Sequence, residues 1–203
     1  MTLPQNQAYH VFEDEDLDCD LALKKSKGFW DIQTNDGKPI WLDTGKVKLD
    51  RIDVYKDKKM GFAFTVSNPK VCDKIVKIET GVRTWAAERL TGQVHSNVML
   101  TRRTIETLLG KTTINPNEEM KCGFDTTKGH FSDGTNSIGA VTSCDTVSAL
   151  AGRSAYLTIE PAFLWFLNEP DKEKRMGVKW YIRMIRLDED YDSINETSDT
   201  WSL

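Results

Sequence analysis

Two strand-like segments in the C-terminal part of this 203-residue chain constrain its fold more than any other feature. They cover residues 153–167 and 176–187, and the charged turn 168–175 separates them. In the second segment the even-numbered residues from Val178 to Met184 are apolar, whereas Lys179, Tyr181 and Arg183 alternate with them. Because successive side chains of a strand point to opposite faces, the pattern predicts one apolar face and one basic, aromatic face. We expect the two strands to pair antiparallel.

The rest of the chain is predicted to form further short strands and one long helix. An Asp-Gly turn at 36–37 separates two aromatic runs, 29–34 and 39–42, which indicates a β-hairpin, and strands are expected at 46–55 and 60–66. A helix should begin at Asn68-Pro69 and end near Gly92. We therefore predict a mainly β protein with one long helix: an OB-fold, which is a five-stranded β-barrel, with an inserted helix and an acidic C-terminal tail. A β-sandwich or jelly roll would give a similar pattern.

Charge divides the chain into three parts. Residues 1–20 carry six acids and no Lys or Arg, and residues 188–203 carry six more acids, again without a base. The remaining 19 acids and all 27 bases lie in 21–187, which leaves that body about +8 although the whole chain is −4. We expect an acidic N-terminal segment, 1–20, a nucleic-acid-binding domain, 21–187, and an acidic tail, 188–203. A cationic body favours a polyanionic ligand, with which acidic ends compete.

Aromatic residues are interleaved with bases throughout this body. Single-stranded nucleic acid is held in this way, because bases stack on flat side chains while Lys and Arg neutralise the phosphates. Two or three of the rings are expected on the surface, and the others in the core. The predicted nucleic-acid-binding residues are Lys24, Lys25, Lys27, Trp30, Trp41, Lys46, Lys48, Arg153, Tyr156, Lys179, Tyr181 and Arg183.

Motifs for catalysis or for a bound metal are not found in the sequence. His10, His95 and His130 have no ligand-like partner at metal-site spacing, and the chain has no nucleophile elbow, phosphate loop or dinucleotide fingerprint. We therefore expect no enzyme activity, no cofactor and no metal. A nuclease-like site would require carboxylates from 43–57 to gather around a metal ion. The four scattered cysteines indicate reduced thiols, although a pairing of Cys122 with Cys144 stays open.

The order of these features resembles a known family. A strand ending in Asn68-Pro69 leads into a helix that carries Ala86-Ala87, and the segments 152–161 and 177–187 follow much later, before an acidic tail. This layout, over residues 45–203, is similar to that of the T-seven-like phage single-stranded DNA-binding proteins and their relatives in large DNA viruses of algae and protists. The acidic N-terminal segment has no counterpart in that family.

The resemblance implies an OB-fold that binds single-stranded DNA during replication, recombination and repair. It also implies that the tail competes with DNA and docks a polymerase, helicase or primase. The docking residues would be Asp188, Glu189, Asp190, Asp192 and Trp201, with Trp201 two places before the last residue.

The location and the other partners follow from the same observations. No apolar stretch is long enough to cross a bilayer, and 1–10 does not look like a signal peptide, so we expect a soluble, intracellular protein without a membrane partner. The resemblance places it in a viral replication compartment, and a homodimer stays open. The alternative function is that of a viral structural protein, such as a minor capsid β-sandwich, with no nucleic-acid role.

Overall fold

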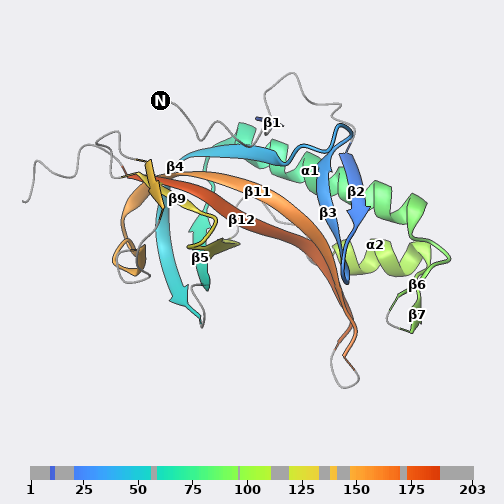
Figure 1. The fold of residues 1–203 in the computed structure, drawn as a ribbon. Coiled ribbons are helices and arrows are strands. Elements are labelled where there is room, and N and C mark those ends of the chain that lie inside the picture. Colours follow the sequence, from blue (N-terminus) through green and yellow to red (C-terminus); the bar gives the residue numbers. More distant parts are fainter. Residues whose placement is uncertain are drawn as a thin grey trace, which may run out of the picture.

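Five strands of the computed structural model close into a β-barrel (Figure 1). The structure describes residues 10–11, 21–55, 59–95, 97–110, 119–132, 138–140, 147–169 and 173–187. The barrel strands are β4 (Ile40–Val54), β5 (Lys59–Thr65), β8 (Glu119–Asp125), β11 (Ser154–Leu167) and β12 (Arg175–Leu187). They pair in the ring β4–β5–β8–β12–β11–β4, in which only β8 and β12 are parallel.

This order makes the barrel OB-like. Numbered along the chain, the five strands follow one another around the ring as first, second, third, fifth and fourth. Such a closed ring is not the pair of facing sheets that a sandwich or jelly roll requires, so that alternative for the fold is wrong.

Short strands extend the sheet beyond the ring. β3 (Phe29–Thr34) pairs with β11, β2 (Leu21–Lys25) pairs with β3, and β1 (His10–Val11) runs parallel to the start of β4. β9 (His130–Ser132) lies beside β12, and β10 (Ile138–Ala140) pairs with β9. The hairpin expected of 29–34 and 39–42 is wrong, because β3 hydrogen-bonds β2 and β11, while β4 hydrogen-bonds β5 and another part of β11.

A bulge explains why β4 looked like two strands in the sequence. Gly45 has a φ of 68°, and its N–H donates to Asp43 Oδ1 at 2.9 Å, a combination that usually marks a turn. Here the strand continues, because the buried Thr44 hydroxyl hydrogen-bonds the carbonyl of Leu157 at 3.2 Å and its N–H at 3.3 Å. The hydroxyl thus replaces a backbone partner where the register shifts.

Two helices of the described residues cover the sheet on the side of β2 and β3. α1 (Pro69–Arg89) begins as expected: the Asn68 side chain accepts a hydrogen bond from the Lys70 N–H at 3.1 Å, and Pro69 opens the first turn. α2 (Arg102–Gly110) packs against α1 and β12, and a small hairpin of β6 (Val94–His95) and β7 (Val98–Met99) joins the helices. Neither helix is long and apolar enough to cross a membrane.

One continuous core fills the barrel and the space under α1. The largest fully buried side chains include Phe62, Phe64, Phe124 and Trp180, and the Trp180 indole N–H donates to Glu79 Oε1 of α1 at 3.1 Å. Burying apolar surface contributes roughly 25 cal/mol per Å², so this packing holds the barrel and helix together. The acidic segments 12–20 and 188–203, with the five predicted docking residues, lie outside the described residues, as does Cys144.

Candidate nucleic-acid interface

The outer face of β12 carries the predicted alternation. Trp180 and Ile182 are buried in the core, whereas Lys179, Tyr181 and Arg183 are half-buried on the outside. The alternation of strand side chains therefore places these three residues on one face, as expected.

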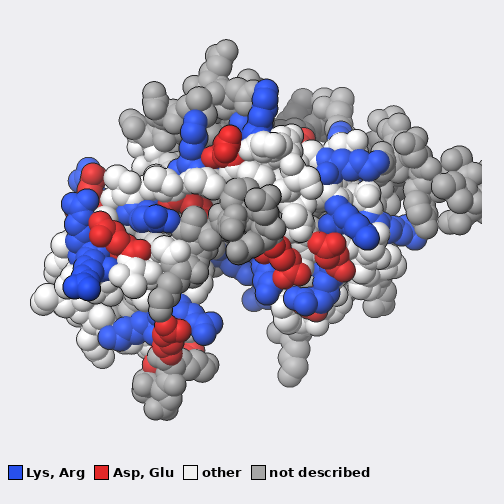
Figure 2. All heavy atoms as spheres, turned by 180° about the vertical axis from the view of Figure 1, so that it is seen from behind, with Lys and Arg blue, Asp and Glu red and all other residues white. Residues whose placement is uncertain are grey.

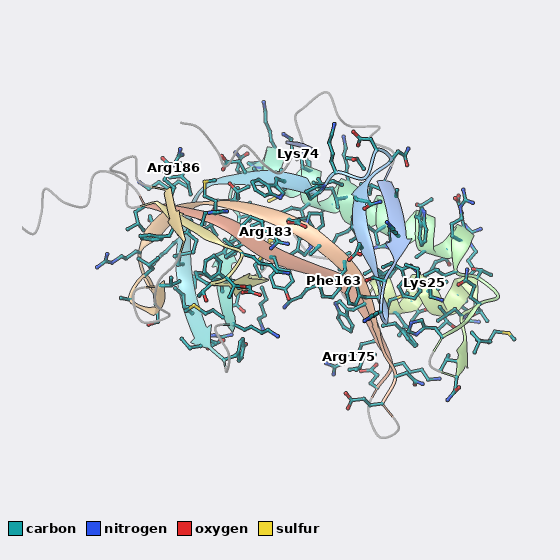
Figure 3. The ribbon with its side chains drawn as sticks, in the orientation of Figure 1. Lys25, Lys74, Phe163, Arg175, Arg183 and Arg186 are labelled. Carbon is teal, nitrogen blue, oxygen red and sulfur yellow. The ribbon has the colours of Figure 1, made fainter. Side chains whose placement is uncertain are left out.

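Rings and cations meet around Tyr181. Lys179 Nζ lies 5.6 Å and Arg183 Cζ 5.5 Å from the centre of the Tyr181 ring, distances at which a cation is attracted to an aromatic face. The Phe163 ring lies 6.2 Å from Tyr181 and 4.6 Å from Phe29. We call Phe29, Phe163, Lys179, Tyr181 and Arg183 the central cluster. Figure 3 labels Arg183, which is on β12, and Phe163, which is on the paired strand β11.

The central cluster faces away from the helices. Leu164 and Phe166 of β11 are buried, and Phe166 packs edge-on against His95 of the hairpin between the helices, with ring centres 5.3 Å apart. Phe163 alternates with these residues and is half-buried on the opposite face. The register Lys24–Asp31–Phe163–Lys179 continues this row to the edge strand β2, where Lys24 is exposed.

The two cations of the central cluster differ in their partners. Arg183 Nε donates to Glu160 Oε2, in an ion pair whose side chains are only 18% and 10% exposed. Lys179 has no carboxylate partner among the described residues. Lys179 is therefore the more accessible charge for a phosphate, while Arg183 is already neutralised by Glu160.

A second group lies farther along the same two strands. The Arg186 guanidinium stacks on the Tyr156 ring at 4.6 Å, and Tyr156 is in register with Lys46 of β4. Lys48 is in register with Ser154, next to the predicted Arg153. The strand alternation puts Tyr156 and Glu160 on the same outer face of β11, so this group continues the central cluster.

Four of the predicted residues lie elsewhere. Trp30 and Trp41 are buried, at 3% and 8% exposure, so the prediction that they stack on bases is wrong. Trp30 instead packs against His95, with ring centres 4.9 Å apart. Lys25 and Lys27 are exposed near the β2–β3 turn, but Lys25 shares its register position with the buried Trp30 rather than with the central cluster.

Three residues of this face, Phe29, Phe163 and Arg186, were not predicted. Phe29 could have been found, because strand alternation places it on the same face as Asp31 and Gln33 and places Trp30 with Ile32. Phe163 lies in the run 162–167, in which every residue is apolar, so the sequence does not show which side of the strand faces the core. Arg186 was missed because strict alternation assigns it to the apolar face with Met184, and only the register shift opposite Thr158 and Ile159 brings it to the outer face beside Tyr156.

Charge on the rear of the molecule is mixed. Figure 2 shows Lys and Arg spread over several parts of that view, with Asp and Glu beside many of them. The cation–ring contacts of Lys179, Arg183 and Arg186 lie on the outer face of β11 and β12.

No described residues form the metal site of the enzyme alternative. No three His, Cys, Asp or Glu side chains gather there as metal ligands would. Asp43 binds the Gly45 N–H, Asp53 pairs with Arg51 at 3.1 Å, and position 57 lies outside the described chain. The Cys122 thiol is enclosed in the barrel, where burial raises its pKa and so keeps it protonated and unreactive.

Comparison of the chain with protein-family models, with curated proteins and with solved structures finds no match in any of the three.

Proposed function

We propose that this chain binds and coats single-stranded DNA during replication, recombination and repair. Bases would stack on the rings of the central cluster, and phosphates would be neutralised by Lys179 and by the cations of the second group around Tyr156. No catalytic step is part of this proposal.

The observation that carries the proposal is the half-buried ring of Tyr181 beside two cations and the Phe163 ring, with Phe29 on the other side of Phe163. A ring binds a base by its flat face, and each stacked base contributes about 1–3 kcal/mol. In a duplex the faces of the bases are already covered by their neighbours, so a row of rings selects unpaired bases. The OB-like barrel supports the proposal further, since barrels of this kind commonly bind oligonucleotides.

The acidic tail, 188–203, would regulate access. Its six acids would compete with DNA for the cations of the barrel and, once displaced, would be free to dock replication proteins such as a polymerase, helicase or primase. This part follows from the charge pattern and from the family resemblance. Deletion of 188–203 should tighten DNA binding, and an unchanged affinity would contradict the competition.

The proposal is tested by titrating the protein with oligo-dT and following tryptophan fluorescence and anisotropy at several salt concentrations. Tyr181→Ala should weaken binding by the contribution of one stacked base, about 1–3 kcal/mol. Lys179→Gln should lower the slope of log K against log salt by about 0.7, the value for one phosphate contact with a single strand. Lys77→Gln on the exposed face of α1 is the matched control, because it removes the same charge away from the rings.

Two results would contradict the proposed function. In the first, both cluster variants bind oligo-dT as the unchanged protein does. In the second, duplex DNA of the same length binds as tightly as the single strand. Parallel titration with oligo-rU shows whether the sugar matters.

A further inference from the structure

Two neighbouring glycines, which we call the glycine strip, contribute no side chains of their own to the outer surface of the barrel. Gly61 of β5 and Gly123 of β8 are register partners in neighbouring strands. Phe62 and Phe124, the next residues, are buried in the barrel, so the glycine positions face outward. A glycine in a strand leaves the backbone open to close approach by another group.

A tyrosine ring fills each of these positions. A Cβ atom at Gly61 would lie 2.9 Å from Tyr55 Oη and 3.0 Å from Tyr55 Cε2. A Cβ atom at Gly123 would lie 2.8 Å from Tyr181 Cε1 and 3.0 Å from Tyr181 Cδ1. These distances are well below the 3.5–4.0 Å of a normal carbon contact, so both rings lie on backbone that only glycine leaves uncovered.

The Tyr55 ring lies over Gly61, and much of the residue is exposed to solvent. Its backbone N–H donates to the Lys59 carbonyl at 2.8 Å, which fixes the residue at the end of β4, and the ring reaches diagonally across to Gly61. Tyr55 is nevertheless 58% exposed, one of the most exposed large apolar residues of the described chain. A ring in this position loses little conformational freedom when a base stacks on it.

The rings on this face follow one another across the strands. Tyr55 lies over β5, Tyr181 lies over β8, Phe163 is on β11, and Phe29 of β3 follows at 4.6 Å from Phe163. Three strand spacings of about 4.8 Å separate β5 from β11, so this part of the row spans about 14 Å. Lys59 and Lys121 occupy exposed outer positions on either side of the glycine strip.

We infer that Tyr55 is a second base-stacking platform, and that the bound strand crosses the barrel transverse to its β-strands, from Tyr55 over Gly61 and Gly123 to Tyr181 and Phe163. The ligand of this platform is an unpaired nucleobase. The inference rests on the proposed function, and it adds a site and a path that the central cluster alone does not define.

The test compares Tyr55→Ala with Tyr55→Phe in the full chain. Oligo-dT of about 16 nucleotides, the upper site size of one OB domain, is titrated against each variant, with Tyr181→Ala alongside. Tyr55→Ala should weaken binding about 5-fold to about 150-fold, which is the loss of one stacked base. Tyr55→Phe should bind like the unchanged protein, because the ring is retained. Thermal unfolding of each variant shows whether the fold is intact.

A direct readout is photocrosslinking with an oligonucleotide that carries 5-iodo-deoxyuridine. Peptides containing Tyr55 and Tyr181 should both be crosslinked, and the Tyr181 crosslink should persist in folded Tyr55→Ala. Unchanged affinity of Tyr55→Ala, together with a loss in Tyr181→Ala, overturns the second platform and leaves the proposed function in place. Equal losses in Tyr55→Ala and Tyr55→Phe also overturn it, since stacking does not need the hydroxyl. Unchanged affinity of both alanine variants overturns the platform and the proposed function together.

Discussion

Replacing Glu160 by Gln should tighten DNA binding while it destabilises the fold. Glu160 accepts a hydrogen bond from Arg183 and is in register with Tyr181, so its negative charge lies within the central cluster. A phosphate that approaches Arg183 meets this carboxylate. Glutamine keeps the shape of the side chain and an oxygen for the Arg183 N–H, and it removes only the charge.

The two effects of Glu160→Gln can be calculated separately. Because both side chains are largely buried, exchanging a charged acceptor for a neutral one should lower the free energy of unfolding by about 1–3 kcal/mol. One more free cation should raise the slope of log K against log salt by about 0.7. If both proteins bind equally at 1 M salt, that difference in slope makes the variant bind about 8-fold tighter at 0.05 M salt and about 4-fold tighter at 0.15 M salt.

The assay is oligo-dT titration at these two salt concentrations, combined with urea unfolding. Glu106→Gln on α2 is the matched control, because Glu106 also pairs with an arginine, Arg102 at 2.9 Å, but in an exposed pair. The control should lose less than about 1 kcal/mol of stability and should not change the affinity, since salt screens a distant charge. Unchanged DNA binding by Glu160→Gln, or an equal gain in Glu106→Gln, would refute the competition between Glu160 and phosphate.

Three other predictions concern the scaffold. Trp30→Ala should cost about 3–5 kcal/mol of stability, seen in urea unfolding, but leave the DNA affinity of the folded protein unchanged; a selective loss of affinity would return Trp30 to the binding face. Asn68→Ala should cost about 1 kcal/mol in the same assay through loss of the α1 cap, and an unchanged midpoint would show that the cap is dispensable. Burial, aided by the Lys25 charge, lowers the pKa of His95 from 6.5, so the unfolded chain takes up the proton first and stability should fall as pH drops below 6.5. His95→Gln should remove that part of the pH dependence of unfolding, and a persistent slope would exclude His95 as its source.

Much of the architecture could be predicted from local patterns. The start of α1 at Asn68-Pro69 and the segments that became β5, β11 and β12 depend on capping and on two-residue alternation, which act between near neighbours in the chain. β4 was predicted less well, because Asp43 and Gly45 have the composition of a turn. Only the contact of Thr44 with Leu157, 113 residues away, makes that segment a bulge within one strand.

The ring residues depend only partly on such local patterns. Alternation separates the two faces of a strand, and on β12 the basic side had to be the outer one, because burying Lys179 and Arg183 would cost far more than burying Trp180. On β3 alternation also separates the faces, because Asp31 and Gln33 lie on the side of Phe29 and Ile32 lies on the side of Trp30. On β11 the run 162–167 is apolar throughout, so nothing local assigns Phe163 to a face. Packing against His95 takes Trp30 into the core and leaves Phe29 beside Phe163.

The amino-acid sequence by itself determined the charge division, the helix start and the basic, aromatic side of β12, since each depends on residue identity and short spacing. Only the tertiary structure placed Phe163 of the apolar run 162–167 on the outer surface, and it brought Tyr55 and Tyr181 onto two glycines of other strands. The physical reason is that closing the barrel fixes strand neighbours and register, and these contacts between distant parts of the chain leave no trace in local spacing.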